Sequence, residues 1–257
     1  MKIAAGIVSC EGYGNPDAND NLLNIYQQIL NESNKKNVDL LCLPGGYLRA
    51  QSKKDKEELA KSIVENAKNY KIAIAVGIDV IDGRSKPVKS SKSRKSKKTT
   101  SSNNIPAFAI CWSPAERQNW HCWQQRSSDS KDWRNVPDED EKTYHEQRSL
   151  RVRSKKIEIL LCGELFNPII RNNIINRGSD IAAVVDLAHG AGGSFNRAIL
   201  SMETLAKGGL VTLCTIHANS RGTLKRRCNP PGKRKSTRNP DKVIKGPPWV
   251  ELKVWDV

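Results

Sequence analysis

The feature that most constrains the fold is a regular alternation of short apolar runs with longer amphipathic segments. Residues 2–9, 39–43 and 71–81 are continuous apolar runs of strand length. Between them, residues 21–30 and 53–69 place apolar side chains at helical spacing. Strands without polar alternation are typical of sheets that are buried on both faces. This part of the chain therefore predicts strand, helix, strand, helix, strand, with Asn19 or Asp20 capping the first helix.

The same alternation continues to the end of the chain. A pair of strands is predicted at 105–112 and 119–125, and residues 127–154 are polar and predicted to be irregular. Further strands are predicted at 157–162, 181–187, 210–216 and 249–255, and helices at 168–176 and 195–207. No internal repeat is visible. We therefore predict one α/β domain over residues 1–257, with mixed strand order.

Composition excludes two classes of protein. With 257 residues and 37% hydrophobic residues, the chain is long enough and apolar enough to bury a core. No apolar run approaches the roughly 20 residues that a membrane-spanning helix needs. We therefore expect neither a wholly disordered chain nor one that spans or binds a membrane.

The net charge of +16 is concentrated in two segments, 83–104 and 221–245. These segments contain eight and ten Lys/Arg, respectively, and a single acid, Asp241. The rest of the chain has 25 Lys/Arg against 26 Asp/Glu and is close to neutral. Such polar stretches cannot bury enough apolar surface to offset chain entropy, so we predict two mobile basic inserts. They are either solvated loops or a contact for nucleic acid or another anionic surface.

Cysteine usage indicates a reducing compartment. The count of seven is odd, and Cys42, Cys111, Cys162 and Cys214 lie in apolar, strand-like runs. No CxxC pair or Cys/His cluster with zinc spacing occurs, so we predict no disulfide framework, metal or cofactor. The apolar run at the start of the chain is too short for a signal peptide and is interpreted as a buried strand. We therefore expect a cytoplasmic protein.

Cys162 is the first candidate for chemistry. It ends an apolar run and is followed by Gly163, Glu164 and a helix that begins near Pro168. A helix N-terminus next to a cysteine can stabilise a thiolate, although most strand cysteines are simply small buried side chains.

A family resemblance favours the reactive interpretation. DANDNLLNIYQQIL (17–30) and VDLLCLPGGYL (38–48) are similar to the opening of the carbon-nitrogen hydrolase (nitrilase) superfamily. The segment ILLCGELFNPIIRNNIINRGSDIAAVVDLA (159–188) resembles the family's nucleophile segment, and AILSMETLAKGGLVTLCTIHA (198–218) resembles the helix and strand that follow it. The resemblance implies a four-layer α-β-β-α sandwich, pairing of two chains into a homodimer, and a Glu-Lys-Cys triad that hydrolyses amides or nitriles or transfers acyl groups.

Carried over residue by residue, the family's triad is incomplete. Cys162 matches the nucleophile, and Glu164 matches an acid that usually lies beside it. The general base falls on Gly45, which has no side chain, and the family's Lys falls on Gln125. Losing a positioned base commonly costs about 10²- to 10⁴-fold in rate. The resemblance thus implies altered or lost hydrolase activity, up to a pseudoenzyme.

Two classes of function remain open on the sequence. In the first, Cys162 acts on a small-molecule amide or nitrile, and Glu11, Glu164 or His121 replaces the base while Arg126 or Lys131 supplies a cation. In the second, the fold is a non-catalytic binding or regulatory module whose segments 83–104 and 221–245 contact nucleic acid or a partner protein.

Several other residues have a structural and a functional interpretation. His189 and His217 each end a predicted strand and are interpreted as loop histidines with satisfied hydrogen bonds, or else as site residues. Residues 190–193 (GAGG) either form an ordinary loop or bind an anion through backbone N–H groups. The aromatic residues Trp120, Trp123 and Trp133 are expected to pack in the core or a pocket wall rather than stack on bases.

Overall fold

The structure is a computed structural model, and it describes residues 1–8, 16–81, 106–116, 120–127, 145–190, 195–217, 228–229, 242–245 and 250–257. Segment 83–104, Glu11, Lys131 and Trp133 lie outside these ranges, as does most of segment 221–245. Four α-helices are described: α1 (Asn19–Lys35), α2 (Lys53–Tyr70), α4 (Pro168–Asn176) and α5 (Phe195–Lys207). None of them is long and apolar enough to cross a membrane.

The described strands form two layers of a continuous sheet. The first layer has the order β6 (His121–Gln124), β5 (Ala107–Trp112), β4 (Ala73–Val80), β2 (Leu40–Cys42), β1 (Lys2–Val8), β13 (Val250–Asp256) and β12 (Lys242–Lys245), with β3 (Leu48–Ala50) beside β4. The second has the order β7 (Ser149–Val152), β8 (Lys155–Leu161), β9 (Ala183–Gly190), β10 (Val211–His217) and β11 (Cys228–Asn229). The layers join where β1 runs parallel to β10, with Ile7 opposite Ile216.

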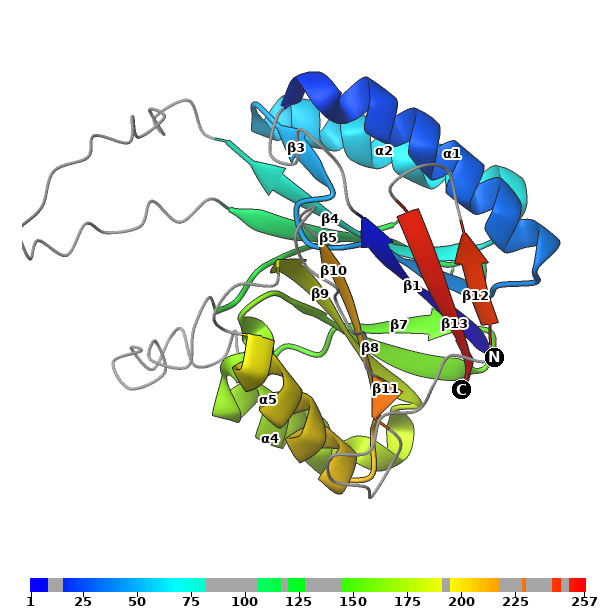
Figure 1. Cartoon of the computed structure of the whole chain (residues 1–257). Helices are drawn as coiled ribbons and strands as arrows, with labels where there is room; N and C mark the ends of the chain where they lie inside the picture. The colour runs from blue at the N-terminus through cyan, green and yellow to red at the C-terminus, as the bar shows by residue number, and fades with distance from the viewer. Residues whose placement is uncertain are drawn as a thin grey trace, which may run out of the picture.

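Three apolar cores show that these layers form an α-β-β-α sandwich. One core lies between helices α1 and α2 and the first sheet layer, and another lies between α4 and α5 and the second layer. The third fills the space between the layers and contains buried residues of β1, β2, β4 and β5 together with residues of β7 to β10. Figure 1 shows the helix pairs on opposite sides of the strands. The predicted four-layer α-β-β-α architecture is confirmed.

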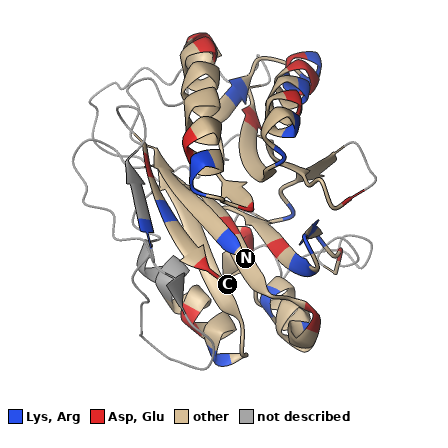
Figure 2. Cartoon of the chain, turned by 90° about the vertical axis from the view of Figure 1, so that its right-hand side faces the viewer, with Lys and Arg blue, Asp and Glu red and all other residues tan. Residues whose placement is uncertain are grey.

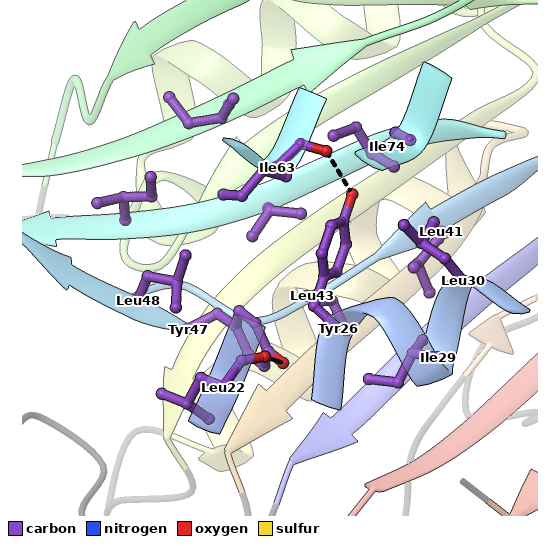
Figure 3. Close-up of a cluster of buried hydrophobic side chains, with 14 of the residues drawn as sticks. Leu22, Tyr26, Ile29, Leu30, Leu41, Leu43, Tyr47, Leu48, Ile63 and Ile74 are labelled. Carbon is purple, nitrogen blue, oxygen red and sulfur yellow. Dashed lines mark hydrogen bonds between the residues drawn. The ribbon is translucent and has the colours of Figure 1, made fainter. Parts of the chain in front are cut away.

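Two buried tyrosines tie helix α1 to helix α2 and to the turn that follows β2. The Tyr26 hydroxyl donates to the carbonyl of Ile63 at 3.0 Å, and the Tyr47 hydroxyl donates to the carbonyl of Leu22 at 2.8 Å. Both rings lie in the apolar cluster of Figure 3. Because Tyr47 directly follows the turn after β2, its bond to α1 also positions that turn.

Several sequence predictions need correction. The first helix extends to Lys35, and its N-cap is Ala18, which makes no side-chain cap. The predicted cap Asn19 instead uses its amide to hold the backbone of Arg49 in β3, donating to its carbonyl at 2.6 Å and accepting from its N–H at 3.1 Å. Strand β7 lies in the stretch predicted to be irregular, and β3 was not predicted.

The basic segment 221–245 is not wholly an irregular insert, because β11 pairs with β10 and β12 pairs with β13. Elsewhere in the described part of the chain, Lys and Arg are mixed with Asp and Glu over the helices and strands (Figure 2). This mixture agrees with the near-neutral composition outside the two basic segments.

Candidate active site

The carboxyl ends of the parallel strands bring the candidate residues together. Strands β4, β2, β1, β10, β9 and β8 run parallel in this order, so their ends lie along one edge of the molecule. Cys162 directly follows β8, and its N–H donates to the carbonyl of Leu187 at 3.2 Å, which ties it to β9. Asp79, His189 and His217 lie at the ends of β4, β9 and β10.

His189 links Asp79 to Cys162. Its Nε2 lies 2.8 Å from Asp79 Oδ1, and the same imidazole interacts with the Cys162 side chain. Burial alone would lower the pKa of His189, but the hydrogen bonds to Asp79 and Cys162 and their negative charges raise it to about 10. The imidazole therefore holds its proton at neutral pH. A half-buried cysteine, a histidine and a buried aspartate thus lie in the order that nucleophilic catalysis requires.

The turn after β2 leaves room for this arrangement only because it consists of glycines. A Cβ atom at Gly45 would lie 2.8 Å from Nδ1 and Cε1 of His189 and 2.7 Å from the carbonyl oxygen of Leu187. Gly46 has φ +61°, and its Cβ would lie 2.6 Å from Asp79 Oδ2. Larger residues at either position would therefore displace His189 or Asp79.

The second histidine of the site is held neutral. His217 is buried, and burial together with the positive charge of His189 lowers its pKa to about 3. Its ring interacts with the backbone of Gly45 and Gly46. His217 therefore supports the glycine turn and leaves His189 as the charged imidazole of the pair.

Glu164 anchors the segment that carries Cys162. The carboxylate is fully buried and accepts hydrogen bonds from the N–H of Leu161 at 3.0 Å and from the N–H of Arg126 at 2.6 Å. It also forms ion pairs with the buried guanidinium groups of Arg126, at 3.2 Å, and Arg148, at 3.1 Å. With its oxygens used in this way, Glu164 positions the loop and does not take the place of a base.

Gln125 also acts on the backbone of this loop. Its amide nitrogen donates to the carbonyl of Cys162 and, at 3.1 Å, to the carbonyl of Ser127. An amide group has two N–H donors, so both are used on backbone carbonyls. Gln125 therefore lies beside the loop that carries Cys162, and its N–H groups hold the backbone of that region.

Comparison with solved structures gives strong matches despite low sequence identity. A mutant amidase from Nesterenkonia sp. AN1 with acrylamide added to its active-site cysteine matches with a TM-score of 0.62 and 14% identity, over 100% of this chain and 93% of that one. Another mutant of this amidase, described as a nitrilase-superfamily enzyme, matches with a TM-score of 0.61 and 14% identity, over 99% and 90%. A double mutant in complex with acrylamide gives 0.63 and 14%, over 100% and 90%.

This chain has the nitrilase-superfamily fold. No family model and no curated protein matches the sequence, so the likeness lies in the structure.

Within this nitrilase-like fold, the other sequence candidates lie elsewhere or have other partners. His121 pairs with Glu116 at 2.6 Å and stacks on Trp123. Trp120 and Trp123 pack against the apolar cores. The structure does not describe residues 191–194, so the anion-binding interpretation of this loop stays a prediction. Among the described residues, no cluster of His, Cys, Asp and Glu could hold a metal ion.

His189 lies in strand β9 rather than in a loop, and its hydrogen-bond partner Asp79 was not singled out from the sequence. A signal for Asp79 was present, because a lone acid in the apolar run 71–81 must be buried and therefore needs a partner. The partner could not be identified, since β4 and β9 are in different layers of the nitrilase-like sandwich.

Proposed function

We propose that this protein is a cysteine-dependent amide hydrolase or acyl transferase that uses Cys162, His189 and Asp79. The single observation that carries the proposal is the position of the His189 imidazole between the Asp79 carboxylate, at 2.8 Å, and the Cys162 side chain. In this arrangement His189 replaces the general base that the family resemblance implies at position 45. The activity is thus altered rather than lost.

The first half of the reaction forms a thioester. The thiolate sulfur of Cys162 attacks the carbonyl carbon of an amide, and the electrons of the C=O bond move to oxygen. When the tetrahedral intermediate collapses, the C–N bond breaks and the leaving amine takes the proton from the His189 imidazolium. Asp79 keeps the imidazole oriented and stabilises its positive charge throughout.

The second half releases the acyl group. The neutral His189 takes a proton from water, and the resulting hydroxide attacks the thioester carbonyl. The C–S bond then breaks, the carboxylic acid leaves, and the Cys162–His189 pair regains its starting state. If an amine or alcohol takes the place of water, the same steps transfer the acyl group to it.

Small amides are the substrate class that the structural neighbours support. The Nesterenkonia amidase mutants contain acrylamide, butyramide or the acetamide moiety of fluoroacetamide. A thioester mechanism also accepts activated esters, which supply a sensitive assay when the natural substrate is unknown.

A panel of small amides, nitriles and activated esters tests the proposal, with turnover and intact mass as readouts. We expect an acyl adduct on Cys162 and a loss of turnover of about 10²- to 10⁴-fold in His189→Gln, the range for removal of a general base. Cys162→Ala should form no adduct. Cys122→Ser, which changes a thiol outside the site, is the control and should keep full turnover. Turnover that survives in Cys162→Ala would overturn the proposal.

Other predictions from the sequence remain predictions. These are the homodimer, the cytoplasmic location and the non-catalytic binding module that contacts nucleic acid. The described part of the structure neither supports nor opposes them. The binding module would be tested by deleting residues 83–104 and measuring salt-dependent retention of DNA or RNA. Unchanged retention would argue against it.

A further inference from the structure

A second reactive pair lies outside the candidate active site, between helix α2 and strand β6. The ammonium group of Lys56 lies 3.2 Å from the sulfur of Cys122. Lys56 is buried, although lysine side chains almost never are, and Cys122 is half-buried against the core of the helix layer. The pair therefore places a thiol and an amine in direct contact within a partly enclosed space.

Two further contacts keep Lys56 in this position. Its ammonium group lies 4.3 Å from the centre of the Phe108 ring, which attracts a cation, and 2.8 Å from the exposed carboxylate of Glu57. Phe108 is in β5, which pairs with β6. The contacts thus come from β5 and from α2 itself, and they hold the nitrogen next to the sulfur.

We propose that Lys56 and Cys122 form a redox-modification site, at which a hydroperoxide converts the pair into a covalent sulfenamide crosslink between α2 and β6. A sulfenic acid condenses with a backbone nitrogen to a sulfenamide, and a deprotonated amine held against the oxidised sulfur is a stronger nucleophile for the same reaction. The 3.2 Å contact supplies that nitrogen.

The reaction balances with hydrogen peroxide as the only oxidant. The Cys122 thiolate attacks one peroxide oxygen, an S–O bond forms as the O–O bond breaks, and hydroxide leaves and is protonated to water. The sulfur is oxidised to sulfenic acid by two electrons. The deprotonated Lys56 amine then attacks this sulfur, an N–S bond forms, and the S–O bond breaks with loss of a second water. The protein loses two hydrogen atoms in total.

The protonation states of the pair set the pH dependence of this reaction. Burial raises the pKa of Cys122, although the Lys56 charge opposes the rise. Burial alone would lower the pKa of Lys56, but hydrogen bonds to Glu57 and Cys122 raise it. Both steps need a deprotonated group, so crosslinking should become faster between pH 7 and pH 9.

The crosslink would be close to the candidate active site along the chain. Strand β6 ends at Gln124, and the next two residues, Gln125 and Arg126, hold the backbone of Cys162 and the carboxylate of Glu164. A covalent bond at Cys122 would therefore restrict the strand that leads directly into these positioning residues.

The test is tryptic peptide mapping of the full chain after treatment with hydrogen peroxide at pH 8.5. We expect peptide 55–61 joined to peptide 118–126, about 2 Da lighter than the sum of the two, and separated again by a thiol reductant. In Lys56→Arg, which keeps the charge, we expect no joined peptide and a sulfenic acid at Cys122 that dimedone traps. Cys122→Ser should give neither product.

Peroxide-treated wild-type protein that contains only sulfenic or sulfinic acid at Cys122, or an unmodified thiol, would overturn the proposal. A joined peptide that persists in Lys56→Arg would also overturn it, because the nitrogen would then come from another residue. The outcome does not depend on the proposed activity of Cys162, since peptide mapping reports Cys122 directly.

Discussion

The imidazole of His189 occupies the space next to the bare Cα of Gly45, where the first side-chain atom of any other residue would lie 2.8 Å from ring atoms Nδ1 and Cε1. The family resemblance places a glutamate at this position as the general base. In this chain the glutamate is absent and a histidine from another strand fills the space beside Cys162. The two positions are therefore coupled, because a side chain at position 45 would meet the His189 imidazole.

This relationship predicts coupled effects of mutation at the two positions. We expect Gly45→Ala to destabilise the fold by about 1–3 kcal/mol, because the methyl group meets the His189 ring and the Leu187 carbonyl. The double mutant Gly45→Ala/His189→Ala should cost about 1 kcal/mol less than the sum of the single mutants. Urea unfolding of the four proteins measures this difference. Gly178→Ala is the control, since its Cβ would meet only ordinary contacts at 3.7 Å or more. Strict additivity would contradict the account.

The pKa of His189 predicts a stability difference that depends on pH. His189 titrates near 6.5 in the unfolded chain and near 10 in the folded protein, so its bond to Asp79 stabilises the fold fully below pH 6.5. This stability is lost as the pH rises through about 10. The free energy of unfolding of the wild type should therefore exceed that of His189→Gln by roughly 2 kcal/mol at pH 5.5 and approach it at pH 10. In an Asp79→Asn background the same comparison should show less pH dependence. A difference that grows with pH would exclude the assigned ion pair.

The contacts of Glu164 with the backbone and two arginines predict a large loss of stability from a small substitution. In Glu164→Gln, the buried guanidinium groups of Arg126 and Arg148 lose their shared carboxylate, which should cost about 3–5 kcal/mol. Cys162 should also react more slowly with alkylating agents, because Leu161 loses a hydrogen bond. The same change at Glu58, whose ion pair with Lys54 is exposed, should leave stability unchanged within error. Equal effects of the two substitutions would contradict this role.

The burial of Asp186 predicts that a neutral residue at this position makes the protein more stable than the wild type. Burial and the nearby charge of Glu164 raise the pKa of Asp186 to about 7, so the folded protein keeps a proton that the unfolded chain releases near pH 3.8. The resulting stability is present below pH 3.8 and is lost as the pH rises to 7. At pH 8, the free energy of unfolding measured in urea should be higher for Asp186→Asn than for the wild type, by a few kcal/mol at most. This difference should shrink toward pH 4. The exposed Asp180→Asn is the control. If Asp186→Asn is no more stable than the wild type at pH 8, the ionised Asp186 does not destabilise the fold.

The sequence predicted elements well where local signals mark their ends. Helix α4 matches its predicted bounds because Pro168 starts it and the Asn167 side chain caps it, accepting from the N–H of Ile169 at 2.9 Å. Helix α1 was predicted too short, since its last turn, NESNK, is mostly polar. Strand β7 was missed because it is only four residues long, so the alternation of buried Leu150 and Val152 is too short to mark a strand without its pairing to β8.

The candidate site was predictable only in part, because some of its residues lie in local motifs and others meet only through the strand order. Candidates could be singled out where a local motif resembles the family, as at Cys162, Glu164, Gln125 and Gly45. The Asp79–His189 pair joins residues 110 positions apart in different sheet layers, and such a contact depends on strand order. Strand order leaves no local trace in a single sequence.

The rate at which chloroacetamide alkylates Cys162, measured by peptide mass from pH 6 to pH 9.5, tests the central claim most directly. Alkylation is a nucleophilic attack by the Cys162 sulfur, and the positive charge of the His189 imidazole stabilises the sulfur as it gives up its proton. We predict that the wild type reacts at least about tenfold faster than His189→Gln at pH 6, and that the difference shrinks as the pH approaches about 10, where His189 loses its charge. Equal rates at pH 6, or a faster reaction in His189→Gln, would contradict the pairing of Cys162 with His189.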